Sequence, residues 1–216
     1  MRLALVLLIA LARMSATGHA GELDALTTDA PSCDATRAHC IGLRLHIAVA
    51  DATPVATAEW IAMQLRGANR HFEPLDVGFQ IVSVDALPAT AARVEDRRER
   101  NQLGRKIPGT ALHVFVTGHL DDIDTPGAMA NGVTWRSNGK KFIIISTQAL
   151  ERTLAHELGH VFGLPHSTYP VSIMNKTPRD EPPIDQRTFA DEEIAKMRPR
   201  FKQLLRARVI ANVKAR

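Results

Sequence analysis

The chain has 216 residues, of which 45% are apolar and 23% are charged, and its net charge is +4. These values are ordinary for a folded, water-soluble domain, and they exclude a disordered chain or one built of membrane spans. The length allows a single hydrophobic core, or two small lobes on either side of a cleft. The excess positive charge lies in Arg93–Lys106 and near the C-terminus, without the interleaved aromatic residues that would indicate a nucleic-acid partner.

The N-terminal segment is typical of an export signal rather than of a fold. Arg2 gives it a positive start, and Leu3–Ala12 is apolar but too short to cross a bilayer easily. Small residues follow up to Ala20. We predict that residues 1–20 are a signal peptide removed after Ala20, and an uncleaved N-terminal anchor is the alternative. Cleavage would leave a secreted or periplasmic protein with no membrane attachment.

Residues 21–40 are polar and indicate an N-terminal arm. This arm contains both cysteines of the chain, Cys33 and Cys40. In an exported chain, the simplest account of two close cysteines is a disulfide that closes a short loop. A second account remains open, in which one thiolate lies over a metal site further along the chain and keeps it covered.

Beyond the arm, strand and helix patterns follow in turn. From Ile41 to Val49 apolar and polar residues alternate, which predicts a half-buried strand. Thr53 and Pro54 resemble a helix cap and a first-turn proline, and they predict an amphipathic helix over 54–72. Apolar runs then predict strands at 79–84, 112–117, 132–136 and 142–146, with a charged loop or short surface helix over 86–108.

Two more helices are predicted in the C-terminal half. The first covers 147–162 and ends at Gly163. Thr188 and Asp191 resemble a capping box at the start of the second, which Pro199 should kink or divide. The order of elements predicts an α+β fold, with an α/β-like lobe over 41–163 and a smaller, irregular lobe over 164–216.

The most informative segment contains three histidines in the pattern of a metal site. His156 and His160 are four residues apart, so on a helix they lie on one face. Gly163 can adopt a positive φ at no steric cost, which lets the chain turn back and present His166. Three neutral imidazoles that leave one position for water match a catalytic zinc ion rather than a structural one. We therefore predict one catalytic Zn²⁺ held by these histidines.

Glu157 has a different role in this segment. It follows the first histidine, and the helical turn rotates it about 100° away from that residue. It should therefore face the open coordination position rather than bind the metal. A carboxylate there can act as the general base that takes a proton from zinc-activated water.

Together with Met174, this segment resembles the metzincin metallopeptidases, in which the long zinc motif is followed by a methionine turn. Met174 lies eight residues after His166, a spacing similar to that of the matrixins. The resemblance implies that Met174 forms an apolar floor beneath the zinc ligands. It also implies that 132–136 is a cleft-side edge strand, which binds extended peptides as an added strand, and that 175–183 walls the pocket for the side chain after the scissile bond.

The function implied by the resemblance is a secreted zinc endopeptidase that hydrolyses peptide bonds in extended protein segments. Its partners would be protein or peptide substrates, and we expect a monomer. A narrow-specificity or self-processing protease and a zinc-bound, non-catalytic binding module are the alternatives. Lys176 stands where astacin-like enzymes carry an additional tyrosine ligand.

Two weaker expectations concern charged residues. Asp121, Asp122 and Asp124 could hold Ca²⁺ through hard oxygen ligands, although acidic turns are usually only solvated. The basic residues near the C-terminus leave polyanion binding as a further alternative.

Overall fold

The computed structural model describes residues 23, 32–107 and 111–213. The predicted signal peptide, residues 1–20, lies outside these described residues. Among the helices of the described part, none is both long enough and apolar enough to cross a membrane.

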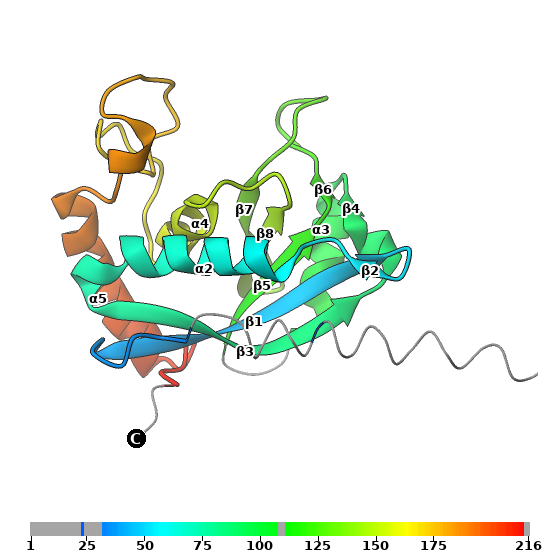
Figure 1. Cartoon of the computed structure of the whole chain (residues 1–216), viewed down its shortest axis with the longest axis horizontal. Coiled ribbons are helices and arrows are strands. Elements are labelled where there is room, and N and C mark those ends of the chain that lie inside the picture. Colours follow the sequence, from blue (N-terminus) through cyan, green and yellow to red (C-terminus); the bar gives the residue numbers. More distant parts are fainter. Residues whose placement is uncertain (1–22, 24–31, 108–110, 214–216) are drawn as a thin grey trace, which may run out of the picture.

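One mixed sheet forms the centre of the molecule (Figure 1). Its strands are β1 (His39–Ala50), β2 (Thr53–Pro54), β3 (Val77–Leu87), β5 (Leu112–Thr117), β7 (Gly132–Ser137) and β8 (Lys140–Ser146). β1 pairs in parallel with β3 and with β5, and β5 pairs in parallel with β8. β7 pairs antiparallel with β8 and ends the strand order β2-β1-β5-β8-β7, which confirms the edge strand predicted at 132–136. A separate pair is formed by β4 (Arg93–Val94) and β6 (His119–Leu120).

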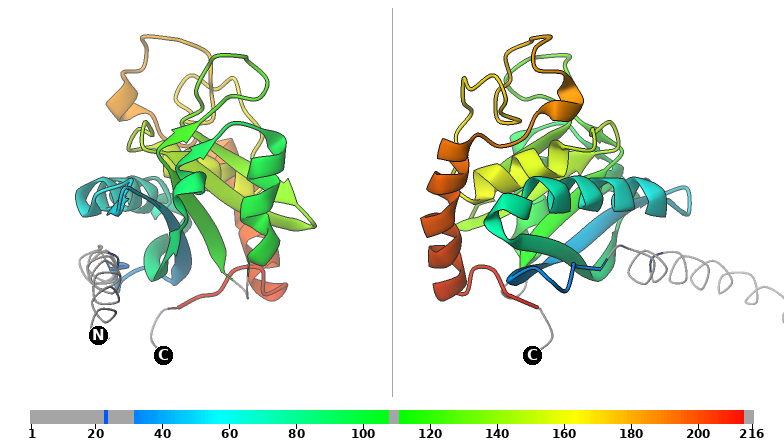
Figure 2. Two further views of the ribbon diagram at one scale, coloured as in Figure 1. Left: turned by 90° about the vertical axis from the view of Figure 1, so that its right-hand side faces the viewer. Right: turned by 60° about the vertical axis from the view of Figure 1, so that its left-hand side comes forward.

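Helices cover both faces of the sheet (Figures 1 and 2). They are α2 (Ala58–His71), α3 (Arg97–Leu103), α4 (Thr153–Val161) and α5 (Asp191–Arg206), with short 3-10 turns at Glu73–Leu75, Ala89–Ala92, Gly104–Lys106 and Ile184–Gln186. α2 and α4 pack against each other and share one core with inward residues of β1 such as Leu43. On the opposite face Phe115, Phe142 and Ile144 form a smaller core, against which Leu103 of α3 packs. This arrangement confirms the predicted α+β class.

α2 begins later than the sequence pattern predicts. Its N-cap is Thr57, whose hydroxyl accepts a hydrogen bond from the backbone N–H of Trp60 at 3.2 Å. Thr53 and Pro54 instead form β2, which pairs with the end of β1. The prediction of a helix start at Pro54 is therefore wrong. Proline is tolerated both in the first turn of a helix and in an edge strand, where its missing N–H costs no hydrogen bond between strands. The local sequence does not distinguish these two positions.

α4 also begins later than the predicted start near residue 147. The side chain of Gln64, on α2, accounts for this difference. Its amide nitrogen donates hydrogen bonds to the carbonyl oxygens of Ala149 and Leu150, at 3.2 and 2.9 Å, and its amide oxygen accepts one from the backbone N–H of Leu154 at 3.1 Å. These bonds satisfy backbone groups that a longer helix would have paired internally, so the chain stays non-helical until α4 begins.

α5 is a single helix although Pro199 lies inside it, so it is not divided into two short helices. The predicted capping box at Thr188 is also wrong. The carboxylate of Glu193 accepts a hydrogen bond from the backbone N–H of Ala190 at 2.9 Å and so caps the helix from within its first turn. Thr188 lies before the helix and forms a β-bridge with Ser172.

The disulfide between Cys33 and Cys40 confirms the simpler account of the two cysteines. Their Cα atoms are 5.9 Å apart, and Cys40 lies in β1, so the bond ties the arm to the central sheet. Neither thiol is free. The alternative in which one of these thiolates covers a metal site is contradicted for this reason.

His71 lies at the C-terminal end of α2 and is only 3% exposed. Its Nδ1 atom lies 3.4 Å from the hydroxyl of Thr188. Burial, with a smaller contribution from the positive charges of Arg70 and Arg152, lowers the pKa of His71 to about 4. The folded protein therefore holds this imidazole in its neutral form.

We predict that protonation of His71 in the unfolded chain makes stability depend on pH. Between about 6.5 and about 4 the unfolded chain binds a proton at His71 that the folded chain excludes, so the free energy of unfolding falls as the pH falls, by at most about 1.4 kcal/mol per pH unit. The contribution is fully present above pH 6.5. Urea unfolding at several pH values should give a shallower slope for His71→Gln than for the wild type, and equal slopes would contradict this prediction.

Candidate active site

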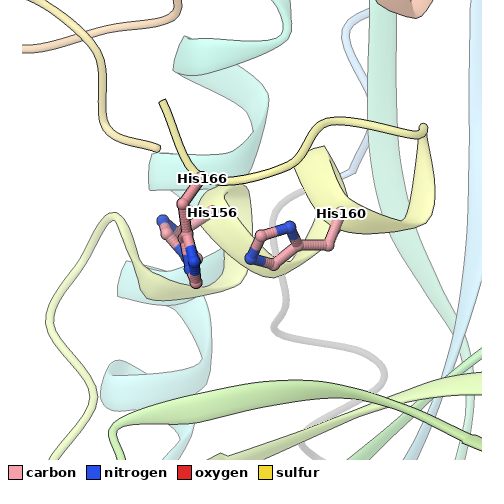
Figure 3. Close-up of side chains that lie close together, drawn as sticks. All are labelled: His156, His160 and His166. Atoms are coloured by element: carbon pink, nitrogen blue, oxygen red, sulfur yellow. The ribbon is translucent and has the colours of Figure 1, made fainter. Parts of the chain in front are cut away.

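The three predicted metal ligands come together at one point (Figure 3). His156 and His160 lie one turn apart on α4, and His166 reaches back from the loop that follows the helix. One ligand nitrogen from each residue lies within 4.8 Å of the others. Among the described residues, this is the one group of three or more histidine, cysteine or acidic side chains that could hold a metal ion.

The turn after α4 brings the third histidine back. Gly163 has a φ of +93°, in the region that glycine adopts without strain. The backbone N–H of Leu164 then donates a hydrogen bond to the carbonyl oxygen of Gly159 at 3.0 Å, which closes the helix end. The chain leaves this turn in the direction that places His166 beside the helix.

Hydrogen bonds fix the two helical imidazoles in the form that binds metal. The Nδ1 atom of His156 lies 2.8 Å from the carbonyl oxygen of Ile173, and that of His160 lies 2.7 Å from the carbonyl oxygen of Leu164. A carbonyl can only accept, so each Nδ1 carries the proton and each Nε2 keeps a lone pair. Burial lowers the pKa of His156 and of His166 to about 4, so these rings are neutral at pH 7. This set of donors fits a zinc ion.

Glu157 is buried beside the histidines, with 4% of its surface exposed. Its carboxylate accepts a hydrogen bond from the hydroxyl of Thr134 on β7 at 2.8 Å, and the same hydroxyl lies 2.8 Å from the backbone carbonyl oxygen of Glu157. Burial raises the pKa of the carboxyl to about 7, and the hydrogen bond from Thr134 opposes part of this rise. A carboxyl with a pKa near neutrality suits both acceptance and release of a proton.

Known proteins resemble the chain in both sequence and fold. Residues 99–194, which include all of α4 and the three histidines, match the family model described as Matrixin. Over this segment the chain is similar in sequence to the matrixins. Among solved structures, metalloproteinase-II from Bacteroides fragilis matches with a TM-score of 0.56 and 14% identity, over 79% of this chain and 55% of that one. The chain thus spans about half the length of that protein, and no curated protein sequence matches it.

One cleft is lined by the three histidines and Glu157. It is also lined by Gly132–Thr134 of the edge strand, by α4 and by Asn175–Arg179. The last of these segments, Asn175–Arg179, belongs to the stretch after Met174 that the family resemblance implied as a pocket wall. Thr134 was not a predicted site residue, because its contact with Glu157 joins a strand to a helix and leaves no periodic signal.

Met174 is fully buried beneath α4. A Cβ atom at Gly159 would lie 2.8 Å from the sulfur of Met174, closer than real Cβ contacts allow. Gly159 therefore lets the methionine approach the helix between the two histidine turns. The Gly159 contact could have been suspected from the sequence, since glycine is otherwise a poor residue inside a helix.

A buried hydrogen-bond network holds the methionine turn in place. The hydroxyl of Ser172 accepts a hydrogen bond from the backbone N–H of Met174 at 2.8 Å and lies 2.7–2.8 Å from both carboxylate oxygens of Glu193. Ser172 and Glu193 are 0% and 4% exposed. The network thereby connects the turn beneath the histidines to the first turn of α5.

None of the remaining sequence candidates joins the histidine cluster, although Asp122 and Asp124 line the same cleft. Asp121 pairs with His119, and Asp124 pairs with Arg97 at 3.2 Å. Asp122 accepts a hydrogen bond from the backbone N–H of Asp124 at 2.9 Å. Two of the three acidic residues thus have basic partners within the protein, and a calcium site there stays a prediction.

We predict that Ser172→Ala lowers the free energy of unfolding by about 3 kcal/mol, because it leaves the N–H of Met174 without a partner and leaves the buried carboxylate of Glu193 with the backbone N–H of Ala190 alone. Ser167→Ala is the matched control. The Ser167 hydroxyl oxygen is buried and has no hydrogen-bond partner among the described residues, so its removal should change stability by less than about 0.5 kcal/mol or raise it. Urea unfolding checks both values. Equal losses in the two variants would contradict a structural role for the network.

Proposed function

We propose that this protein is an exported zinc endopeptidase that cleaves extended protein segments, with one zinc ion held by His156, His160 and His166. One observation carries the proposal. A buried carboxylate, Glu157, is held by Thr134 directly beside three imidazoles, two of which are oriented by hydrogen bonds through Nδ1. A structural zinc site has four protein ligands and needs no such carboxylate.

In the proposed reaction, Glu157 is the general base and then the general acid. Zinc, when bound by the imidazoles, supplies a Lewis acid that lowers the pKa of water and polarises a carbonyl group. The Glu157 carboxylate takes a proton from the attacking water as the water oxygen bonds to the carbonyl carbon. Glu157 then gives this proton to the amide nitrogen as the C–N bond breaks, which yields a carboxylic acid and an amine. Thr134 keeps the carboxylate in position during both transfers.

The edge strand supports extended segments as the substrate. In the described part of the chain, β7 pairs with β8 alone, so its outer edge offers backbone groups to an added strand. This edge also lines the cleft above Glu157. A folded helix could not pair with it, whereas an unfolded or extended polypeptide could.

The proposal includes the location and boundaries of the mature protein. Residues 1–20 would be removed on export, 21–40 would form the arm, and 41–216 the catalytic domain with its lobes meeting near residue 163. The Cys33–Cys40 disulfide supports an extracytoplasmic location, because such bonds persist in oxidising compartments. The mature protein would act as a monomer without nucleic-acid or membrane partners.

Two alternatives differ from this proposal in their consequences. A narrow-specificity or self-processing protease would use the same chemistry on few sequences. A zinc-bound, non-catalytic binding module would not require Glu157, and the hydrogen bond that orients its carboxylate disfavours that class.

We predict that the purified protein, loaded with zinc, cleaves unfolded casein and that Glu157→Ala reduces the rate by about a hundredfold or more, because the proton acceptor is lost. Both proteins should bind one zinc ion per chain, measured by elemental analysis. Undiminished cleavage by Glu157→Ala would contradict the assigned role. Zinc in both proteins without cleavage by either would favour the narrow-specificity or binding alternatives.

Thr134→Val tests the positioning of Glu157. Valine keeps the shape of threonine but cannot donate the hydrogen bond, so we expect kcat to fall about tenfold while KM changes less than about twofold. Thr134→Ser should restore most of the rate, and zinc content should be the same in all three proteins. A loss confined to KM, or no rescue by serine, would show that Thr134 acts in another way.

A further inference from the structure

Three arginines gather in the cleft beside the start of α4. Arg152 directly precedes the helix, and Arg179 and Arg187 come from the segment after the methionine turn. All three are half-buried and line the same cleft as the histidines. Burial is the largest cause that lowers the pKa of Arg152, and the positive charges of Arg187 and Arg179 lower it further. The three guanidinium groups are therefore close enough to interact. Like charges held together in this way favour an anion between them.

The arginines differ in how their donors are used. Arg179 donates to the backbone carbonyl oxygens of Pro170, Ser172, Asn175 and Thr177 at 2.7–3.0 Å, so it mainly supports the loop. Arg187 donates to the carbonyl oxygens of Pro182 and Arg179 at 2.9 and 2.6 Å, and one of its terminal nitrogens makes no such bond.

The guanidinium of Arg152 forms no hydrogen bond or ion pair with any residue that the structure describes, whereas its backbone carbonyl oxygen accepts the N–H of His156. The adjacent carboxylate, Glu151, pairs instead with Arg70, at 3.8 Å. A half-buried guanidinium is rarely left without an acceptor, since its five N–H groups need partners once water is partly excluded. Arg152 therefore has donors available to a molecule that enters the cleft.

The direction of the edge strand indicates which part of a substrate would pass these arginines. A Cβ atom at Gly132 would lie 2.9 Å from the side chain of Thr153, the first residue of α4, and 3.1 Å from that of Glu157. Thr134 hydrogen-bonds Glu157, and Lys141, which pairs with Arg136 of β7 in the sheet, donates to the carbonyl oxygen of His160 at 2.9 Å. β7 thus runs from the start of α4, past the general base, toward Ser137. An antiparallel peptide on its free edge would run the opposite way, and the residues after the scissile bond would lie beside Arg152.

We propose that Arg152, supported by Arg187 and Arg179, binds a substrate carboxylate on the C-terminal side of the scissile bond. This inference rests on the proposed endopeptidase function and adds the chemistry of the preferred substrate. Two sources supply the same chemistry, the side chain of an Asp or Glu and the free C-terminus of a short peptide. A planar guanidinium can hold either one through two parallel hydrogen bonds. An acidic side chain would make the enzyme select acidic segments, whereas a free C-terminus would make it trim chain ends.

The cleavage sites in casein are first mapped by mass spectrometry. The cleavage rates of two amidated peptides, which differ only in having Glu or Gln after the scissile bond, are then compared. We expect kcat/KM to favour Glu by about tenfold or more in the wild type, and to fall to within about twofold in Arg152→Gln. Arg206→Gln, which replaces an exposed arginine on α5, is the matched control and should keep the preference for Glu over Gln. Arg152→Glu should instead favour Lys over Gln at this position, a reversal that loss of folding cannot produce.

A binding measurement separates failure of this inference from failure of the proposed function. Zinc-loaded Glu157→Ala is titrated with three short fluorescent peptides. The first has one Glu and an amidated C-terminus, the second has Gln in its place and an amidated C-terminus, and the third has Gln and a free C-terminus. Stronger binding of the Glu peptide supports an acidic side chain, and stronger binding of the free-acid peptide supports a chain end, provided that Arg152→Gln removes the difference. Equal affinity for all three peptides, or a preference that survives Arg152→Gln, overturns the inference even if casein is cleaved. Absence of casein cleavage with this binding preference intact counts against a broad endopeptidase and leaves the carboxylate site standing.

Discussion

The contact between Thr134 and Glu157 joins the two parts of the molecule that must act together. Thr134 belongs to the edge of the sheet, and Glu157 belongs to the helix that carries two of the histidines. The threonine hydroxyl lies 2.8 Å from both the backbone oxygen and the carboxylate of Glu157, so one side chain fixes the helix and orients its acidic group. Because a peptide would add to the same strand, this contact also sets the distance between the base and the scissile bond.

The position of α4 depends equally on what lies beneath it. The absence of a side chain at Gly159 admits the sulfur of Met174, and the backbone of the methionine turn is held by Ser172. Ser172 in turn hydrogen-bonds the buried carboxylate of Glu193, which also caps α5. A buried carboxylate is costly unless its oxygens are paired, so this network requires all of its members. The methionine turn and the first turn of α5 thus support the helix that carries His156 and His160.

The histidine cluster could be predicted from the sequence because its geometry is local. One helical turn separates His156 from His160, and the positive φ of Gly163 follows from the need to bring the third histidine back. The buried strand at 112–117 was equally clear from its composition. The starts of the helices were not, because polar side chains distant in sequence, such as Gln64, satisfy backbone groups there. Periodicity records which residues face a core and does not record such pairings.

The central claim is that three histidines bind zinc and leave one position open for water. X-ray absorption at the zinc edge, measured on the zinc-loaded protein in solution, reports the elements around the metal and their distances. We predict a first shell of three imidazole nitrogens and one oxygen at roughly 2.0–2.1 Å, with no sulfur. Sulfur at about 2.3 Å, a fourth imidazole nitrogen, or a folded protein that retains no zinc would contradict the claim.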